Sequence, residues 1–410
     1  MIKTALTFLL IYFSLQIASE LNKDNLRDLK PSPKKIPVTF DAHGVKRVDN
    51  YYWMRDDTRK DQEVIDHLNT ENAYLEGWFA SGLDERDKLF QEITDRIPKK
   101  EDSVPIRLKN YEYFRRYEPE NEYAIYIRRK NKNSEEIVLL DVNELAHGKD
   151  FYQLANWSIS PSESLMAYAE DINGRRQYSI KFKDLIKSET YDYVIENTSG
   201  DMAWSAEGDY LFYVLRDEET LLPHKVFRHK VGTSQDTDEL VYEEKDTTFY
   251  LSVGNTRSME FIELSISSTT SSETRLIKSN NPTSSPEIFY KREKDHLYSV
   301  DHDPASDRFL IESNWNATNF RLLEVNLIDS KVKENWKEII PHREAVLLQA
   351  VIPFPKHLVV MERENGLKKL RILDKESLNS RTVNFNDPSY TAYLASVSYT
   401  HLRAHETNVD

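Results

Sequence analysis

The sequence predicts an all-β propeller that follows a short α-helical N-terminal arm. Residues 61–97 carry apolar side chains at helical spacing. Beyond Pro98, short runs rich in Tyr, Phe, Val and Ile alternate with Asp, Asn, Gly and Ser, which is typical of β-strands and turns. These runs recur with a period in the high forties, as the blades of a propeller do.

The chain begins with a pattern typical of a signal peptide. Met1–Lys3 supply positive charge, Ala5–Ile17 form one apolar run, and the small residues Ala18 and Ser19 follow it. The run is too short to span a bilayer comfortably, and the alternatives are an uncleaved anchor or a buried strand. We therefore predict a signal peptide over residues 1–19 and a secreted or periplasmic protein that has no membrane span after cleavage.

A polar linker over residues 20–36 precedes the predicted arm, which covers residues 37–98. Pro31 and Pro33 favour extended backbone in the linker. Within the arm we predict helix from Asp61 to Ile97, ended by the proline that follows. The apolar positions that predict this helix are Val64, Leu68, Leu75, Phe79, Leu83, Leu89, Phe90 and Ile93.

The strand-like runs after the arm are arranged as repeats. The runs are residues 111–117, 122–129, 137–142, 165–171, 210–217, 261–267, 308–314, 357–363 and 370–374. An apolar trio preceded by a turn signal begins at five positions with gaps of 45, 50, 48 and 49 residues, namely Met166, Leu211, Phe261, Phe309 and Leu358. Regular spacing over five units favours a propeller over an irregular β-sandwich.

Similar phrases stand before some of these trios. Trp157–Pro161 and Met202–Ala206 are closely related, and Asp301–Pro304 has a similar turn role. We therefore predict a β-propeller over residues 99–395. That this is an incomplete β-propeller, and that residues 396–410 are a non-native tail, is implied by the family resemblance given below.

Composition excludes several classes of function. The 410 residues include no cysteine, so a disulfide, a thiolate zinc site, a cysteine nucleophile and a lipoprotein anchor are all impossible. A formal charge of −14 disfavours nucleic acid and anionic membranes as partners and favours cationic peptides. No two of the ten glycines are two or four residues apart, so the chain lacks both G-x-G-x-x-G and the serine-nucleophile motif G-x-S-x-G. We predict no catalytic residue, cofactor or metal site in this chain.

Two groups of charged residues have more than one interpretation. Arg128–Lys130 and Lys132 form a basic run, for which a solvated hairpin turn is favoured over a nucleic-acid patch. Five acidic residues are interpreted as ordinary surface charge, although they would also suit the attraction of cationic peptides to the propeller; they are Glu118, Glu120, Glu122, Glu243 and Glu244.

Histidine and tryptophan residues give weaker signals. His401 and His405 have the spacing of metal ligands on one helix face, but Glu406 follows them instead of lying between them as in H-E-x-x-H. We therefore interpret them as part of the non-native tail. Four tryptophans are expected to pack in the core or within blades and not to form a ligand cage: Trp53, Trp157, Trp204 and Trp315.

Longer phrases, found in a fixed order along the chain, resemble one known family. Ala42–Arg59 resembles the phrase HGxxRxDxYYWLRDDxR of oligopeptidase B, a member of the prolyl oligopeptidase family of serine peptidases, with Met54 in place of the usual Leu. His67–Asn72 resembles its helical phrase HLxxEN, and the resemblance runs from about Pro37 to Tyr390. Further matching segments are Arg96–Pro98, Asp102–Pro105, Gly174–Leu185, Glu219–His229, Leu240–Val253, Ser267–Glu273 and His357–Leu367.

The resemblance implies a seven-bladed propeller that caps an α/β-hydrolase domain, and this chain would hold the arm and about six of those blades. The family cleaves short peptides after Lys or Arg with a Ser-Asp-His triad and no cofactor, and its propeller screens access. The triad would lie beyond the C-terminus, so we expect the chain alone to be inactive. Its expected partners are short cationic peptides and the missing C-terminal hydrolase domain. Two alternatives remain open: a non-catalytic propeller that binds peptides or proteins, and a prolyl oligopeptidase with proline specificity.

Overall fold

A computed structural model describes residues 30–394 of the chain. The chain divides into two compact units, Met1–Pro98 and Lys99–Asp410. Most of the predicted linker belongs to the residues outside the description, as do the predicted signal peptide and tail. Among the described residues, no helix is both long enough and apolar enough to cross a membrane.

The first unit begins with a β-hairpin that the sequence analysis did not predict. Strands β1 (Val38–Ala42) and β2 (Val45–Asp49) pair in antiparallel fashion. His43 and Gly44 connect them with φ values of 56° and 73°, the left-handed pair that a two-residue hairpin turn requires. The short helix η1 (Tyr52–Met54) follows.

The region predicted to be helical, Asp61–Ile97, forms three successive helical segments. The segments are α3 (Gln62–Phe79), η2 (Ala80–Gly82) and α4 (Leu83–Asp95). Gly82 has φ −113° and ψ 15°, outside the helical region, and glycine makes such a departure at little steric cost. Asp61 caps α3 by accepting a hydrogen bond from the backbone N–H of Glu63 at 2.9 Å. Several apolar side chains of these helices are exposed: Leu68, Leu75, Trp78, Phe79, Leu89, Phe90 and Ile93.

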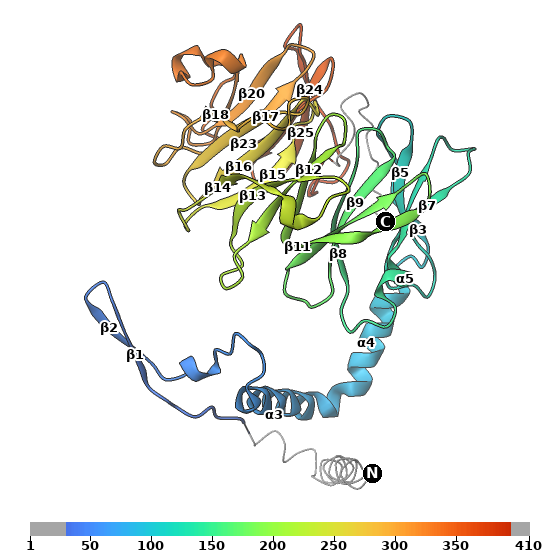
Figure 1. Ribbon diagram of the computed structural model, residues 1–410, viewed down its shortest axis with the longest axis vertical. Helices are drawn as coiled ribbons and strands as arrows, with labels where there is room; N and C mark the ends of the chain where they lie inside the picture. Colours follow the sequence, from blue (N-terminus) through green and yellow to red (C-terminus); the bar gives the residue numbers. More distant parts are fainter. Residues whose placement is uncertain (1–29, 395–410) are drawn as a thin grey trace. The chain divides into compact units, whose positions relative to one another are not determined.

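From Lys99 onward, the described strands form five antiparallel sheets that follow one another along the chain, from teal to red in Figure 1. In the first sheet β5 pairs with β3, β4 and β6, and β6 pairs with β7. Its strands are β3 (Glu101–Asp102), β4 (Ile106–Arg107), β5 (Glu112–Tyr117), β6 (Ile125–Arg129) and β7 (Ile137–Asp141). The short helix α5 (Val142–Ala146) follows it.

The other four sheets are meanders in which each strand pairs with the next. The second contains β8 (Gln153–Ile159), β9 (Leu165–Asp171), β10 (Tyr178–Asp184), β11 (Glu189–Trp204), β12 (Tyr210–Arg216), β13 (Pro223–Lys230) and β14 (Glu239–Glu243). The third contains β15 (Tyr250–Asn255), β16 (Phe261–Ser267), β17 (Ser272–Lys278) and β18 (Glu287–Tyr290).

The fourth sheet contains β19 (Tyr298–Asp303), β20 (Arg308–Ser313), β21 (Arg321–Val325) and β22 (Lys337–Ile340), and the fifth contains β23 (Val346–Pro353), β24 (His357–Glu364), β25 (Leu367–Asp374) and β26 (Ser380–Thr382). Three short helices lie in the connections: η3 (Gln235–Thr237), η4 (Leu327–Asp329) and η5 (Lys333–Asn335).

Strand β11 belongs to two repeats at once. Its first part pairs with β10, its last part pairs with β12, and the register shifts between Thr198 and Met202. Asn197 and Gly200 have φ values of 59° and 87° at this point. The second sheet is therefore two four-stranded meanders that share one strand.

The five apolar trios predicted from the sequence occupy equivalent positions. They lie on the second strand of successive meanders, β9, β12, β16, β20 and β24, and the first residue of each trio is buried. Hydrophobic clusters join neighbouring sheets: Phe212 and Leu264 share one cluster, and Phe289 and Phe309 share another. The predicted fold class, an all-β propeller after a helical arm, is confirmed, whereas the number of blades stays a prediction.

A tight turn between the first and second strands recurs in three repeats. A Ser or Thr hydroxyl oxygen accepts a hydrogen bond from the backbone N–H five residues later; these residues are Ser160, Ser205 and Thr256, with N···O distances of 3.1, 3.0 and 3.2 Å. The residue three positions after the hydroxyl is left-handed; these residues are Glu163, Gly208 and Met259, with φ values of 57°, 74° and 63°. The first and third of these turns reach the cavity described next.

Candidate functional site

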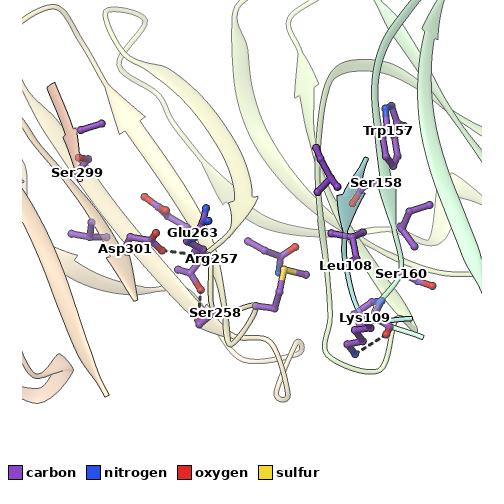
Figure 2. A pocket seen from close by; sticks show the side chains of 18 of the residues that line it. Leu108, Lys109, Trp157, Ser158, Ser160, Arg257, Ser258, Glu263, Ser299 and Asp301 are labelled. Atoms are coloured by element: carbon purple, nitrogen blue, oxygen red, sulfur yellow. Dashed lines mark hydrogen bonds between the residues drawn. The ribbon is translucent and has the colours of Figure 1, made fainter. Parts of the chain in front are cut away.

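A cavity of about 990 Å³ lies between the sheets of the second unit, and Figure 2 shows its lining. Its walls come from β4, β8, β15, β16, β19, β20 and β23 and from the turns that follow some of them, so all five sheets contribute. We call this space the inter-sheet cavity. A volume of this size is in the range of sites that bind small molecules or short peptides.

One side of the cavity carries three carboxyl groups, which we call the acidic wall. Glu263 comes from β16, Asp301 from β19 and Glu312 from β20. All three are half-buried, so their carboxyl groups are largely withdrawn from bulk water while they line the cavity. Strands of two neighbouring sheets thus bring together acidic residues that are far apart in the sequence.

Two of these carboxyl groups bind backbone N–H groups of adjacent sheets. Asp301, in the fourth sheet, accepts a hydrogen bond at 2.9 Å from the backbone N–H of Arg257, in the turn after β15 of the third sheet. Glu312, also in the fourth sheet, accepts one from the backbone N–H of Val351 in β23 of the fifth sheet. The acidic wall therefore connects three successive sheets at the cavity.

Burial, and to a smaller extent the charge of Asp301, raise the pKa values of the two glutamates on this wall. Desolvation raises the pKa of Glu263 to about 7, the nearby charge of Asp301 adds to the rise, and a hydrogen bond from Ser265 opposes it. Desolvation likewise raises the pKa of Glu312 to about 7, against the lowering effect of its bond from the main chain. Desolvation also raises the pKa of Asp301. Near neutral pH the wall therefore holds protonated as well as ionised carboxyl groups.

The opposite side of the cavity carries three apolar side chains, Ile106, Leu108 and Trp157, which we call the apolar wall. The polar residues Lys109, Ser158 and Ser160 lie on the same side. Figure 2 shows Leu108 and Trp157 across the cavity from Glu263 and Asp301. The Trp157 indole is half-buried and packs against the Tyr126 ring, with the ring centroids 5.7 Å apart.

The described residues that line the cavity include two with cationic side chains, and both hold main-chain carbonyl groups. Lys109 Nζ donates to the carbonyl of Pro161 at 2.7 Å. Arg257 Nε donates to the carbonyl of Pro353 at 3.1 Å, and its guanidinium lies 4.8 Å from the centroid of the Phe354 ring. Both cationic groups therefore bind the main chain of neighbouring segments.

The described lining holds serine hydroxyl groups without a histidine beside them. Ser158, Ser160, Ser258 and Ser299 reach the cavity, but no histidine is among the described residues that line it, so none of these serines has a histidine base beside it there. Across residues 30–394, no group of three or more His, Asp or Glu side chains is arranged to hold a metal ion.

The structure corrects the interpretation of the basic run at Arg128. This side chain is 4% exposed on β6, and its Nη1 and Nη2 atoms donate to the carbonyl groups of Glu163 and Leu185 at 2.8 and 3.1 Å. Arg129 is half-buried and pairs with Glu112 at 3.2 Å. These two arginines join strands and sheets, so a solvated turn was the wrong interpretation for them.

The acidic pair at the end of β14 also needs a correction. Glu244 is 8% exposed, forms an ion pair with Arg292 and accepts a hydrogen bond from the Tyr242 hydroxyl at 2.9 Å. It is an internal ion-pair partner and not ordinary surface charge. Glu120 and Glu122 are exposed, as predicted.

The tryptophans have different surroundings. Trp204 is fully buried in the core, and Trp315 packs against Trp336 with a centroid distance of 6.1 Å, both as predicted. Trp53 donates from its indole N–H to the carbonyl of Lys34 at 2.9 Å. Trp157, on β8 of the second sheet, packs against Tyr126 on β6 of the first sheet and also lines the cavity.

The acidic wall was not predicted from the sequence. A usable signal existed, because Glu263 and Glu312 each interrupt an apolar strand, in FIELSIS and RFLIES. A carboxyl group inside such a strand requires a partner or a cavity. Which strands face one another could not be read from either segment alone.

Comparison with known proteins gives matches over most of the chain. A family model described as "Prolyl oligopeptidase, N-terminal beta-propeller domain" matches residues 30–405. Dipeptidyl aminopeptidase BI of Pseudoxanthomonas mexicana is 37% identical over 382 residues, which are 88% of this chain and 52% of that protein. Protease 2 of Moraxella lacunata is 33% identical over 378 residues, 90% of this chain and 53% of that protein.

Solved structures match over a similar extent. Oligopeptidase B from Leishmania major has a TM-score of 0.83 at 28% identity, over 89% of this chain and 54% of that one. Oligopeptidase B from Trypanosoma brucei, with covalently bound antipain, has a TM-score of 0.80 at 25% identity, over 88% and 54%. The chain thus spans about half the length of the relatives it matches.

Proposed function

Because the chain belongs to the prolyl oligopeptidase family of peptidases and carries that family's N-terminal β-propeller domain, we propose that it is the substrate-admitting part of a serine peptidase that cleaves short peptides after Lys or Arg. The catalytic serine, aspartate and histidine would belong to the half of the relatives' length that this chain does not match. No cofactor is required for that chemistry.

The two-sided inter-sheet cavity is the observation that supports a cationic substrate. A Lys or Arg side chain has an aliphatic stem and a charged end. The stem suits the apolar wall, where the face of Trp157 also favours a guanidinium or ammonium group. The charged end suits the acidic wall, where partial desolvation strengthens attraction to Glu263 and Glu312.

Hydrolysis by the complete protein tests the proposed reaction. Fluorogenic peptide amides that differ only in having Arg, Lys or Pro before the scissile bond would be compared. Cleavage after Arg and Lys that is blocked by a serine-directed phosphonate supports the proposal. Cleavage after Pro would establish the prolyl alternative. Peptide binding without cleavage of any substrate would establish the alternative of a binding module.

A charge-specific experiment tests the role of the cavity. Replacing both Glu263 and Glu312 with Gln keeps their shape but removes their charge, and we expect KM for long Lys-containing peptides to rise about tenfold while kcat changes little. For peptides that carry norleucine in place of the Lys distal to the scissile bond, the same substitutions should change KM little. The control is Glu287→Gln, which removes an exposed carboxylate from β18 of the same sheet as Glu263. Equal KM for both peptide types in all variants would contradict the proposal.

We also propose that the protein is exported. The basic start, the single apolar run and the small residues after it support a secretory signal over residues 1–19. The absence of cysteine is compatible with an oxidising compartment, because no thiol is available to mispair there.

A further inference from the structure

We propose that the acidic wall is a proton-operated latch between three neighbouring sheets, closed while Glu263 and Glu312 hold protons and open when Glu263, Asp301 and Glu312 are all ionised. The latch is a property of the propeller itself, so it does not depend on the proposed peptidase activity. Its effect would be to let water enter between the third, fourth and fifth sheets at the inter-sheet cavity.

The geometry of the latch is set by two hydrogen bonds that cross between sheets. The bond from the Arg257 N–H to Asp301 joins the third sheet to the fourth, and the bond from the Val351 N–H to Glu312 joins the fourth to the fifth. Glu263 faces the same cavity from the third sheet. Each of these two sheet-crossing hydrogen bonds therefore has a carboxyl group as its acceptor. A change in the total charge of the wall changes the energy of both contacts.

Like charge from neighbouring sheets is what opens the latch. The charge of Asp301 raises the pKa of both glutamates, so each of them repels Asp301 when ionised. The bonds from the Val351 and Arg257 N–H groups favour the ionised carboxyl groups, but desolvation outweighs them. Separating the sheets lets water solvate the carboxylates, which lowers the energy of the ionised wall more than that of the protonated wall. Ionisation consequently shifts the equilibrium toward the open arrangement.

The sign of the pH response follows from linkage. Burial raises the pKa of Glu263 and of Glu312 to about 7 in the closed arrangement, and hydration on opening returns each toward its ordinary value. The closed arrangement thus binds more protons than the open one. Closure is complete at acidic pH and is lost as the pH rises through about 7.

The other charged groups around the cavity offset the repulsion on the wall only in part: the charges of Arg257 and His302 lower the pKa of Asp301, but desolvation outweighs them. Arg257 and Lys109 donate to main-chain carbonyl groups. Glu163, on the side of the cavity toward the second sheet, accepts hydrogen bonds from Asn110 and from the Tyr113 hydroxyl. The ring of His302, the neighbour of Asp301 on β19, packs against aromatic rings, and its Nε2 atom lies 3.3 Å from Asp307.

Backbone hydrogen exchange of the 410-residue chain, resolved to single amides, tests the latch. Protection of the Val351 and Arg257 amides, corrected for the intrinsic pH dependence of exchange, should fall on the order of tenfold between about pH 6 and pH 8.5. The internal control is the Trp204 amide, which also crosses between sheets but donates to the neutral side-chain oxygen of Asn255 at 2.9 Å. Its corrected protection should not change.

Two variants separate the latch from general loosening of the fold. Glu263→Gln and Glu312→Gln mimic the protonated groups, and the side-chain amide introduced by Glu312→Gln retains an oxygen that can accept the bond from Val351. In each variant, we expect the corrected protection of the Val351 and Arg257 amides to stay up to about pH 8.5 at the value measured at about pH 6. Glu287→Gln should behave like the unchanged chain. Corrected protection at Val351 that is constant with pH in the unchanged chain, or that falls equally in the two wall variants, would overturn the proposal.

Discussion

Asn255 and Trp204 are joined by two reciprocal hydrogen bonds across neighbouring sheets. The Trp204 backbone N–H donates to Asn255 Oδ1 at 2.9 Å, and Asn255 Nδ2 donates to the Trp204 carbonyl at 2.9 Å. The side-chain amide thus pairs both backbone polar groups of the last residue of β11 and connects the second sheet to the third.

Replacing Asn255 with Ala should lower the free energy of unfolding by about 1–3 kcal/mol, because it leaves a donor and an acceptor of the Trp204 backbone unpaired beside a buried core. Denaturant unfolding followed by tryptophan fluorescence measures the change. Asn133→Ala, in an exposed turn, should change the free energy by less than about 0.5 kcal/mol. Equal effects of the two changes would contradict the assigned role.

Glu163 should be a second sensitive position, because its buried carboxylate accepts three hydrogen bonds from the first sheet. The donors are the backbone N–H and Nδ2 of Asn110, at 3.0 and 2.9 Å, and the Tyr113 hydroxyl at 3.1 Å. We expect Glu163→Ala to lower the free energy of unfolding by about 3 kcal/mol. Glu207→Ala, in the equivalent turn of the next repeat, removes an exposed carboxylate and serves as the control. A loss at Glu163 no larger than at Glu207 would show that the bonds contribute no net stability.

His296 should make the fold sensitive to acid. Burial, with the nearby charge of Lys333, lowers its pKa to about 4, and the unfolded chain binds a proton near the ordinary value of 6.5. The unfolded state therefore binds more protons below about pH 6.5, and stability falls as pH drops from there toward 4, by on the order of 2–3 kcal/mol. His296→Gln should flatten this part of the stability curve measured by denaturant unfolding. His147→Gln, at an exposed position, should leave the curve unchanged.

The 410-residue chain alone should not hydrolyse arginyl or lysyl peptide amides. Its sequence has no G-x-S-x-G, so it offers no serine on a nucleophile elbow, and it has no cysteine. The measurement is amide hydrolysis beside an intact relative of the family. Turnover that persists through repeated purification and is abolished by a serine-directed phosphonate would refute this prediction.

Export predicts a new N-terminus near Ser19 or Glu20. The apolar run ends at Ile17, and small residues suitable for cleavage follow it. N-terminal sequencing of material recovered outside the cytoplasm of a bacterial host measures the cut. Recovery of protein that still begins at Met1, and only from the cytoplasm, would reject a cleaved signal.

The repeats were predictable because they are local. The trios at Phe261 and Phe309 are strand-forming residues followed by period-two alternation, and they lie on β16 and β20 as expected. The hairpin at residues 38–49 was also signalled, by the alternation over Val38–Ala42 and by His43-Gly44, but it is short and mostly exposed.

The contacts made by buried charges were not predictable, because their partners are distant in the sequence. Arg128 binds the carbonyl of Leu185, 57 positions away, and Glu244 pairs with Arg292, 48 positions away. In the sequence, the basic run and the acidic pair each have the pattern of an exposed turn. Only the assembled sheets show that Arg128 binds a main-chain carbonyl group and that Glu244 pairs with an arginine in the interior. The acidic wall escaped prediction for the same reason.

The sharing of β11 between two meanders has a practical consequence for anyone who wishes to divide or rewire this protein. A cut or circular permutation between the third and fourth sheets, in the loop after β18, would separate complete meanders. A cut within Glu189–Trp204 would remove a strand from both of its meanders at once. A pulling force applied across this strand would likewise act on both meanders, so we expect them to unfold together. For the same reason, we expect a folded chimaera to need both meanders from the same parent protein.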